Sequence, residues 1–346
     1  MKARHIVLEA ARARMLAIAC FGLLVLAGNM PAQQGASGYH LVKSVKIECP
    51  GGWDYLSIDP ETRRLFISHG THVVVLNADT GAVVGDIPDT PGVHGVALAP
   101  DLNRAFSSNG QGNNVSILDL KTLKKIGEVP AGKDPDAIIY DPVSRRVFAM
   151  NRVSHNATAI DGANGMVAGT IPFPGNPEFA AADGHGKVFV NIESKSQVAE
   201  IDSQTLKVLH YWPLAPCKEP SGMAIDAAHG RLFVGCDNHM MAVVDTQSGK
   251  IVATVPTGDG VDANRFDPGT GWAFSSNGES QTITVVHEDS PDKYTVVDNV
   301  KTGEGGRTME VDPKTHNVYI MTAKLIPAKP FPRPAPGTLQ LLIFAR

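Results

Sequence analysis

The feature that most restricts the fold of this 346-residue chain is a unit of about 42 residues that occurs seven times. Each copy has a short apolar strand that ends in Asp or a small residue, then a turn, then a second strand that carries an aromatic side chain. The string DPETRRLF, which starts at Asp59, is a clear example. The equivalent positions, spaced 40 to 45 residues apart, are Asp59, Ala99, Asp141, Asp183, Asp226, Asp267 and Asp312. Self-similarity at such a period indicates a repeat architecture in which neighbouring units bury a common core.

Each copy contains four short segments with the alternating or apolar pattern of β-strands, joined by Asp-Pro, Asp-Gly or Thr-Gly turns. Four such strands make one propeller blade. The last copy stops at its third strand, residues 338–346, and residues 39–48 near the other end supply the missing fourth. The sequence therefore predicts an all-β, seven-bladed β-propeller over residues 39–346, closed by the N-terminal strand, which joins the last blade. The predicted blades begin near residues 54, 94, 136, 178, 221, 262 and 307.

The first 32 residues have the pattern of a secretory signal peptide. Four basic residues precede an apolar run, Met15–Ala27, and small or polar residues follow it. The run is too short for a membrane span, so we expect a periplasmic or secreted protein without one. Removal of residues 1–32 changes the formal net charge from −4 to −7. This balance disfavours non-specific nucleic-acid binding, which depends on Lys and Arg.

Three cysteines remain after the predicted cleavage, and none has CxxC spacing. Cys217 lies in the loop that enters the fifth blade, and Cys236 ends the second strand of that blade. Because both positions are on the same face of one blade, we predict a disulfide between them, with Cys49 left free. The alternative is that all three are reduced.

Two sets of equivalent positions are expected at one end of the propeller axis. The loop that enters each innermost strand and the loop between its second and third strands open on the same face. The first set comprises Asp54, His94, Asp136, Glu178, Ser221, Asp262 and Arg307. The second set comprises His69, Asn109, Asn151, Ile192, Cys236, Asn277 and Thr322. We predict a ligand site built from Asp54, His94, Asp136, Glu178, Asp262, Arg307, His69, Asn109, Asn151 and Asn277.

Three interpretations of this ring remain open. Polar residues at a channel mouth can simply face water. Alternatively, the mouth binds a small polar molecule, a peptide or a protein. Finally, four converging carboxylates, which Arg307 neutralises only in part, suit a divalent cation such as calcium or zinc. Its ligands would be Asp136, Glu178 and Asp262.

The longest irregular segment is the Pro-rich loop 323–337, AKLIPAKPFPRPAPG. It joins the second and third strands of the last blade and therefore lies on the same face as the ring. Its prolines favour an extended polyproline conformation. It is either a semi-rigid flap or partner-docking segment, or a loop without a role.

Several strings resemble those of YVTN-type propellers, and specifically of the YncE-like periplasmic proteins. They are the DP-x-x-x-R-x-F turn units, the segment Asp245–Gly258, and the FSSNG strings at Phe106 and Phe274. The resemblance covers residues 39–346, although the literal tetrapeptide YVTN is absent. It implies a seven-bladed propeller and allows single-stranded DNA binding, which the net charge and the carboxylates at the mouth disfavour. Relatives in this superfamily include quinoprotein amine dehydrogenase-like subunits, haem-d nitrite reductase domains and lactonases.

We therefore expect an exported, monomeric binding propeller without catalysis. The alternative from another class is a metal-dependent hydrolase that resembles the gluconolactonase-type propellers. In it, Glu178, Asn109, Asn151 and Asp262 would hold a cation that polarises a lactone carbonyl. A further alternative is a cofactor-associated oxidoreductase subunit, but the chain has no haem-attachment motif. It also lacks the G-x-S-x-G string of serine hydrolases.

Overall fold

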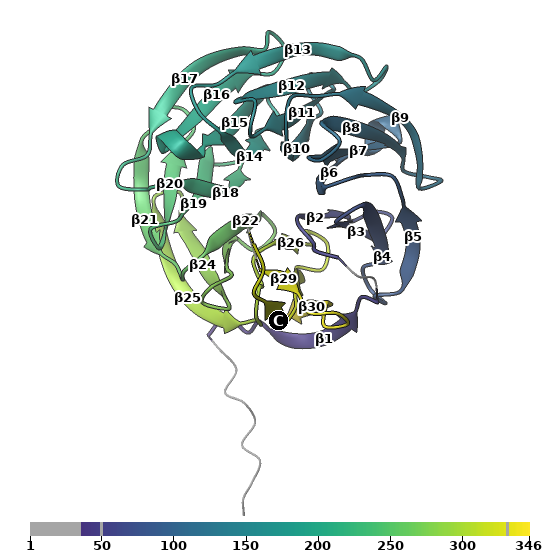
Figure 1. Cartoon of the computed structure of the whole chain (residues 1–346). Helices are drawn as coiled ribbons and strands as arrows, with labels where there is room; N and C mark the ends of the chain where they lie inside the picture. Colours follow the sequence, from purple (N-terminus) through teal and green to yellow (C-terminus); the bar gives the residue numbers. More distant parts are fainter. Residues whose placement is uncertain (1–35, 49–50, 330–331) are drawn as a thin grey trace, which may run out of the picture. The chain divides into compact units, whose positions relative to one another are not determined.

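The computed structural model describes residues 36–48, 51–329 and 332–346, so the predicted signal peptide and Cys49 lie outside it. Seven four-stranded antiparallel sheets form the blades of a propeller (Figure 1). The fold predicted from the repeat is confirmed. In the described part of the chain, the only helical segments are two 3₁₀ turns, η1 (Pro100–Leu102) and η2 (Glu193–Lys195). No helix in these ranges has the length and apolar character needed to cross a bilayer.

The strands of each blade run outward from the axis in the following order. Blade 1 comprises β2 (Leu56–Asp59), β3 (Arg64–His69), β4 (His72–Asn77) and β5 (Val83–Ile87). Blade 2 comprises β6 (Val93–Ala99), β7 (Arg104–Asn109), β8 (Asn114–Asp119) and β9 (Lys124–Pro130). Blade 3 comprises β10 (Pro135–Asp141), β11 (Arg146–Asn151), β12 (Asn156–Asp161) and β13 (Val167–Pro172). Blade 4 comprises β14 (Pro177–Ala182), β15 (Lys187–Ile192), β16 (Gln197–Asp202) and β17 (Lys207–Pro213).

The remaining blades follow the same plan until the last. Blade 5 comprises β18 (Pro220–Asp226), β19 (Arg231–Cys236), β20 (Met240–Asp245) and β21 (Ile251–Pro256). Blade 6 comprises β22 (Val261–Asp267), β23 (Trp272–Asn277), β24 (Thr282–Ser290) and β25 (Lys293–Lys301). Blade 7 comprises β26 (Met309–Val311), β27 (Val318–Thr322), β30 (Gln340–Ala345) and β1 (His40–Lys46). The innermost strands contact one another in a closed cycle, from β2 through β26 and back to β2.

The ring is closed by a strand from the other end of the chain. β1 pairs with β30 in antiparallel register, with His40 opposite Ala345 and Lys46 opposite Gln340. Just before β1, Tyr39 packs its ring edge-on against Phe274 of blade 6, at a centroid distance of 5.4 Å. This pairing gives blade 7 its fourth strand and covers the outer edge of β30, which would otherwise be open to pairing with another chain.

In every blade except blade 2, which has Ala99 at this position, the Asp of the repeat caps the turn after the innermost strand. In blade 1, the Asp59 carboxylate accepts hydrogen bonds from the backbone N–H groups of Glu61 and Thr62 and from the Thr62 hydroxyl. Asp141 makes the same contacts with Val143 and Ser144 in blade 3. Asp side chains favour such turns because their short carboxylate reaches backbone donors two or three residues ahead.

The core lies between neighbouring blades. One aromatic side chain per blade, on the second strand, is at most 1% exposed. These residues are Phe66, Phe106, Phe148, Phe189, Phe233, Phe274 and Tyr319. They join the apolar clusters between adjacent sheets. Burial of such a side chain contributes about 1.5–3 kcal/mol, so inter-blade packing holds the ring together.

Two further features lie on the face where the blades receive their innermost strands. Cys217 and Cys236, the pair predicted from their positions, form a disulfide with an S–S distance of 2.09 Å. The Pro-rich loop is not wholly irregular, because β28 (Leu325–Ile326) and β29 (Arg333–Pro334) pair as a short antiparallel ladder. Leu325 at its base packs with Trp53, which directly precedes the predicted site residue Asp54.

Candidate functional site

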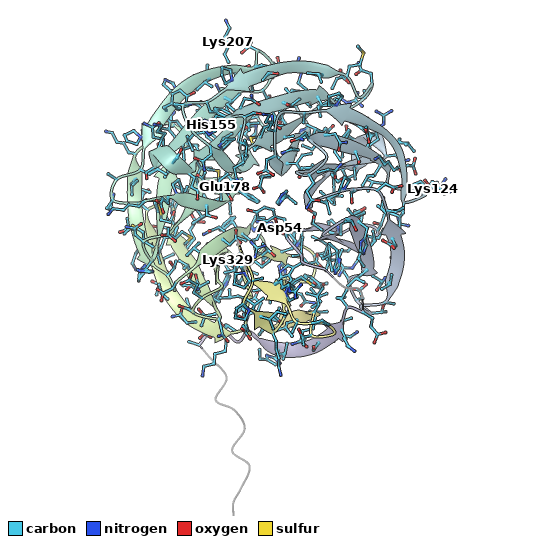
Figure 2. All side chains as sticks on the ribbon, viewed as in Figure 1. Asp54, Lys124, His155, Glu178, Lys207 and Lys329 are labelled. Carbon is cyan, nitrogen blue, oxygen red and sulfur yellow. A yellow bond between two sulfur atoms is a disulfide. The ribbon has the colours of Figure 1, made fainter. Side chains whose placement is uncertain are left out.

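Six of the predicted site residues gather around the propeller axis. Asp54 and Glu178, at the entries to blades 1 and 4, point toward the centre of the ring (Figure 2). We call the set the axial cluster: Asp54, His94, Asp136, Glu178, Asp262 and Arg307. Repetition of the blade explains the convergence, because each residue occupies the same entry position in its own blade. The structure therefore brings together charged groups that are up to 253 residues apart in the sequence.

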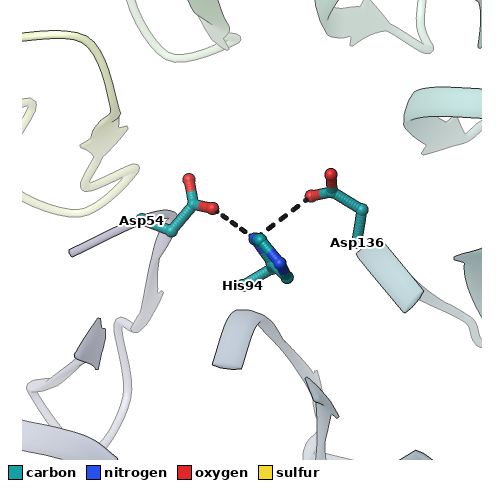
Figure 3. Close-up of side chains that lie close together, drawn as sticks. All are labelled: Asp54, His94 and Asp136. Carbon is teal, nitrogen blue, oxygen red and sulfur yellow. Dashed lines mark hydrogen bonds and ion pairs between the residues drawn. The ribbon is translucent and has the colours of Figure 1, made fainter. Parts of the chain in front are cut away.

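His94 is held between two carboxylates (Figure 3). Its Nδ1 lies 2.6 Å from Asp54 Oδ2 and 3.6 Å from Asp136 Oδ1. Burial alone would lower the pKa of His94. The hydrogen bond to Asp54 and the charges of Asp136, Asp54 and Asp134 outweigh burial and raise this pKa to about 9. His94 is therefore an imidazolium at neutral pH and donates to Asp54.

Arg307 is the second cation of the cluster. Its Nη1 donates to Asp262 Oδ2 at 2.7 Å, and its Nη2 donates to the Trp53 carbonyl at 3.1 Å and lies 3.7 Å from Asp54 Oδ1. Burial raises the pKa of Asp262, and Arg307 opposes that shift. Both ends of the guanidinium are thus engaged by the protein itself.

Glu178 has no such partner. Its Oε2 atom is buried and makes no hydrogen bond with any described residue. Burial, followed by the neighbouring charge of Asp136, raises the pKa of Glu178 well above its ordinary value. Burial also raises the pKa of Asp136, although the charge of His94 opposes the shift. The axial cluster thus contains four carboxylates and two cations, with Arg152 at its margin, 4.0 Å from Asp136. Glu178 Oε2 remains without a hydrogen-bond partner among the described residues.

Two aromatic rings lie beneath these carboxylates. Tyr55 follows Asp54, Phe179 follows Glu178, and their ring centroids are 4.9 Å apart although they come from blades 1 and 4. The pair therefore bridges the axis. Arg265 lies 5.3 Å from the Phe179 ring centroid and pairs with Glu310 at 2.9 Å. At the same position, the other five blades carry Gly95, Ala137, Gly222, Ala263 and Thr308.

The sequence analysis missed Tyr55 and Phe179, although a signal was present. Two aromatic residues at a position that is otherwise Gly, Ala or Thr indicate that they fill space which the other blades leave free. Tyr55 is only 5% exposed. The axial cluster thus rests on an aromatic floor, defined here as Tyr55 and Phe179.

The second predicted set of residues does not join the axial cluster. Asn109, Asn151 and Asn277 are fully buried, and His69 is 1% exposed. The Asn109 amide donates to Asn114 Oδ1 and Ser116 Oγ, and Asn151 and Asn277 make the equivalent contacts in their own blades. These side chains turn into the hairpin between the second and third strands because they end a strand whose alternation points them inward. Asn109 and Asn151 are therefore not brought to Glu178 and Asp262, as the lactonase alternative requires.

The predicted metal ligands, Asp136, Glu178 and Asp262, do not form one group in the structure. Asp262 accepts a hydrogen bond from Arg307. The ligand atoms that lie within 4.8 Å of one another belong instead to Asp54, His94 and Asp136. A second group with this spacing, Asp226, His229 and Glu288, lies between blades 5 and 6. Within residues 36–48, 51–329 and 332–346, no other group of three or more such side chains has this spacing.

A surface cleft of about 530 Å³ lies elsewhere, between blades 1 and 2. Its lining includes His72, Asp89, Lys125 and Glu128. Lys125 Nζ already pairs with Glu128 at 2.8 Å and donates to the Asp89 carbonyl at 3.0 Å. Because the lysine of this cleft is already paired with Glu128, we place the candidate site at the axial cluster, where the buried Glu178 Oε2 has no hydrogen-bond partner among the described residues.

The substitution Glu178→Gln is expected to stabilise the ligand-free protein by about 2 kcal/mol above neutral pH, because an unsatisfied buried charged group is removed. The unfolded chain ionises this carboxyl near its ordinary pKa of 4.5, while the folded protein retains the proton to higher pH. Stability of the unsubstituted protein is therefore lost as pH rises above that value. Urea unfolding at acidic and alkaline pH measures the difference, which should be small at about pH 5. An equal gain at both pH values would contradict this account.

Comparisons with known proteins support the propeller fold. No protein-family model matches the chain, and no curated protein matches its sequence. Among solved structures, the chain is similar to hydrazine synthase of Kuenenia stuttgartiensis, with a TM-score of 0.70 and 17% identity over 80% of this chain and 94% of that one. It is also similar to the WD40 repeats of RRP9, with a TM-score of 0.76 and 9% identity over 90% and 99% of the two chains. For U3-55K, the TM-score is 0.73, the identity 8%, and the coverage 89% and 99%. At such identities the likeness shows the fold alone.

Proposed function

We propose that this chain is an exported binding propeller of the YncE-like type, whose axial cluster takes a small polar ligand or peptide group that carries positive charge. The observation that carries the proposal is the buried Glu178 Oε2, which has no hydrogen-bond partner among the described residues. The nearby cations have partners of their own, since His94 bonds to Asp54 and Arg307 bonds to Asp262. Arg152, at the margin, lies 3.5 Å from Asp134. A cation from outside the protein would supply what Glu178 and Asp136 lack.

Export to the periplasm or the exterior is part of the proposal and rests on residues 1–32 of the sequence. The propeller fold is compatible with a binding role, because such folds present loops from every blade around one axis. Single-stranded DNA, which the family resemblance would allow, is disfavoured because a polyanion would meet four carboxylates at the axis.

A thermal-shift screen with charged and neutral small molecules tests the proposal. Cationic compounds are expected to raise the melting temperature of the purified protein, because a ligand that binds only the folded state stabilises it. The Glu178→Gln variant should lose most of this response. Glu61→Gln is the matched control, since Glu61 lies in a turn on the opposite face and its side chain is 84% exposed. If anionic compounds alone stabilise the protein, or if Glu178→Gln responds as fully as the unsubstituted protein, the axial cluster is not a cation site.

A metal-dependent hydrolase is the second candidate, and the proximity of Asp54, His94 and Asp136 favours it. Their ligand atoms lie within 4.8 Å of one another, and imidazole with carboxylate donors suits zinc. In this case, the metal would displace the proton that His94 now donates to Asp54. Elemental analysis of the purified protein distinguishes the two functions. Stoichiometric zinc or calcium that is lost in the variant His94→Ala would favour the hydrolase.

A further inference from the structure

The aromatic floor provides a second line of evidence about the ligand, beside the acidic groups. Tyr55 is 95% buried, and its ring packs across the axis against Phe179 at a centroid distance of 4.9 Å. Burial and the charges of Asp262, Glu178, Asp136 and Asp54, in that order, raise the pKa of the Tyr55 hydroxyl. The Tyr55 side chain therefore lies close to four carboxylates, among them Glu178, whose buried Oε2 has no hydrogen-bond partner among the described residues.

The chemistry of the aromatic floor favours an organic cation over a metal ion. Calcium takes six to eight oxygen ligands in flexible geometry, and magnesium demands a nearly octahedral oxygen shell. Here Tyr55 and Phe179, whose ring centroids are 4.9 Å apart, add mainly ring carbon beside the carboxylates and not the further oxygen ligands that such a shell needs. An organic cation, by contrast, is attracted both by carboxylates and by aromatic faces. Phe179 already acts in this way within the fold, since the Arg265 guanidinium lies 5.3 Å from its ring centroid.

The other charged groups near the axial cluster are consistent with an organic cation as its ligand. Arg152, at the margin of the cluster, lies 3.5 Å from Asp134 and 4.0 Å from Asp136. Asp134 and Arg152 therefore offset each other, and the excess of carboxylates over cations in the axial cluster remains. Arg307 keeps 44% of its side chain exposed, and the Asp262 side chain beside it is 17% exposed. Solvent thus reaches the cluster from its open side.

We propose that the ligand of the axial cluster is an organic ammonium compound, whose charged nitrogen lies between Glu178 and Asp136 and against the Tyr55–Phe179 floor. This inference rests on the proposed function and names the chemical class of its ligand. The Tyr55 hydroxyl donates to a polar atom of the same ligand.

Isothermal titration with 1,5-diaminopentane tests the inference, with 1,5-pentanediol as the uncharged analogue and calcium chloride as the metal arm. We expect the diamine to bind and the diol not to bind. Phe179→Leu weakens the binding of the diamine roughly three- to thirtyfold, the range expected for loss of a cation–π contact. Tyr55→Phe keeps the ring and weakens the binding by a smaller factor. The matched control is Phe266→Leu, which removes an aromatic ring stacked on Phe233 at 5.0 Å between blades 5 and 6.

The outcomes separate this inference from the proposed function. If calcium binds in a Glu178-dependent manner and the diamine does not, the ammonium inference is overturned and the cation site stands. If neither binds, both are overturned. If the diamine binds equally well to Phe179→Leu and Phe266→Leu, the aromatic floor has no part in recognition, and the inference fails. Unfolding curves of each variant ensure that only folded protein is compared.

Discussion

Replacement of Tyr39 by alanine is expected to lower the free energy of unfolding by about 4 kcal/mol, as for other fully buried aromatic side chains. Tyr39 is 3% exposed, although it lies outside every strand. Its ring packs edge-on against Phe274 and Trp272, at centroid distances of 5.4 and 6.2 Å. Its hydroxyl donates to the His316 carbonyl at 2.8 Å. The substitution therefore leaves a cavity where the N-terminal segment packs between blades 6 and 7.

Two further variants separate packing from hydrogen bonding in urea-unfolding experiments. Tyr39→Phe loses only the hydroxyl contact and should cost about 1 kcal/mol. Leu41→Ala changes a side chain in the adjacent strand β1 that is 51% exposed, and it should cost less than about 0.5 kcal/mol. If Tyr39→Ala proves as stable as Leu41→Ala, the packing of Tyr39 contributes little to closure of the ring.

Replacement of Arg307 by methionine is expected to destabilise the protein by about 3 kcal/mol, because it leaves Asp262 as a buried, unpaired carboxylate. The ion pair spans 2.7 Å between blades 7 and 6, and the same guanidinium contacts Asp54 at 3.7 Å. The expected value lies at the low end for a broken buried pair because 44% of the Arg307 side chain is exposed.

A second substitution tests the cause of this loss. The double variant Arg307→Met/Asp262→Asn removes both charges and should recover most of the lost stability, since no lone carboxylate remains. Arg145→Met is the control for loss of a surface arginine. Arg145 is 55% exposed and lies 3.5 Å from Asp101, so its loss should change stability by less than about 1 kcal/mol. Equal instability of the single and double variants would assign the effect to packing instead.

The fold was predictable because its determinants are local and repeated. The Asp of each turn, such as Asp59 or Asp141, hydrogen-bonds to residues two and three positions ahead, so its effect is visible in a short string. Seven copies then determine the number of blades. The incomplete last copy indicates that a strand from the other end must pair there.

The candidate site was predictable only in part. The positions that enter each innermost strand were expected to converge on the propeller axis, and the six residues of the axial cluster lie there. Which groups pair across the ring depends on side-chain rotamers, so the sequence could not indicate that His94 bonds to Asp54 and Arg307 to Asp262. Asn109 and its equivalents were misplaced because a polar residue at the end of a strand can cap a hairpin as well as face a channel. Tyr55 and Phe179 were missed because their contact is made across the axis, between blades that are distant in the sequence.

The pairing of β1 with β30 also determines when the molecule can fold. His40 lies near the start of the described residues, and its partner, Ala345, lies 305 positions later. The ring therefore cannot close until the residues of β30 have been synthesised. Contacts between such distant residues slow folding and leave incomplete sheets open to aggregation. We therefore expect ring closure through β1 and β30 to be a late step of folding.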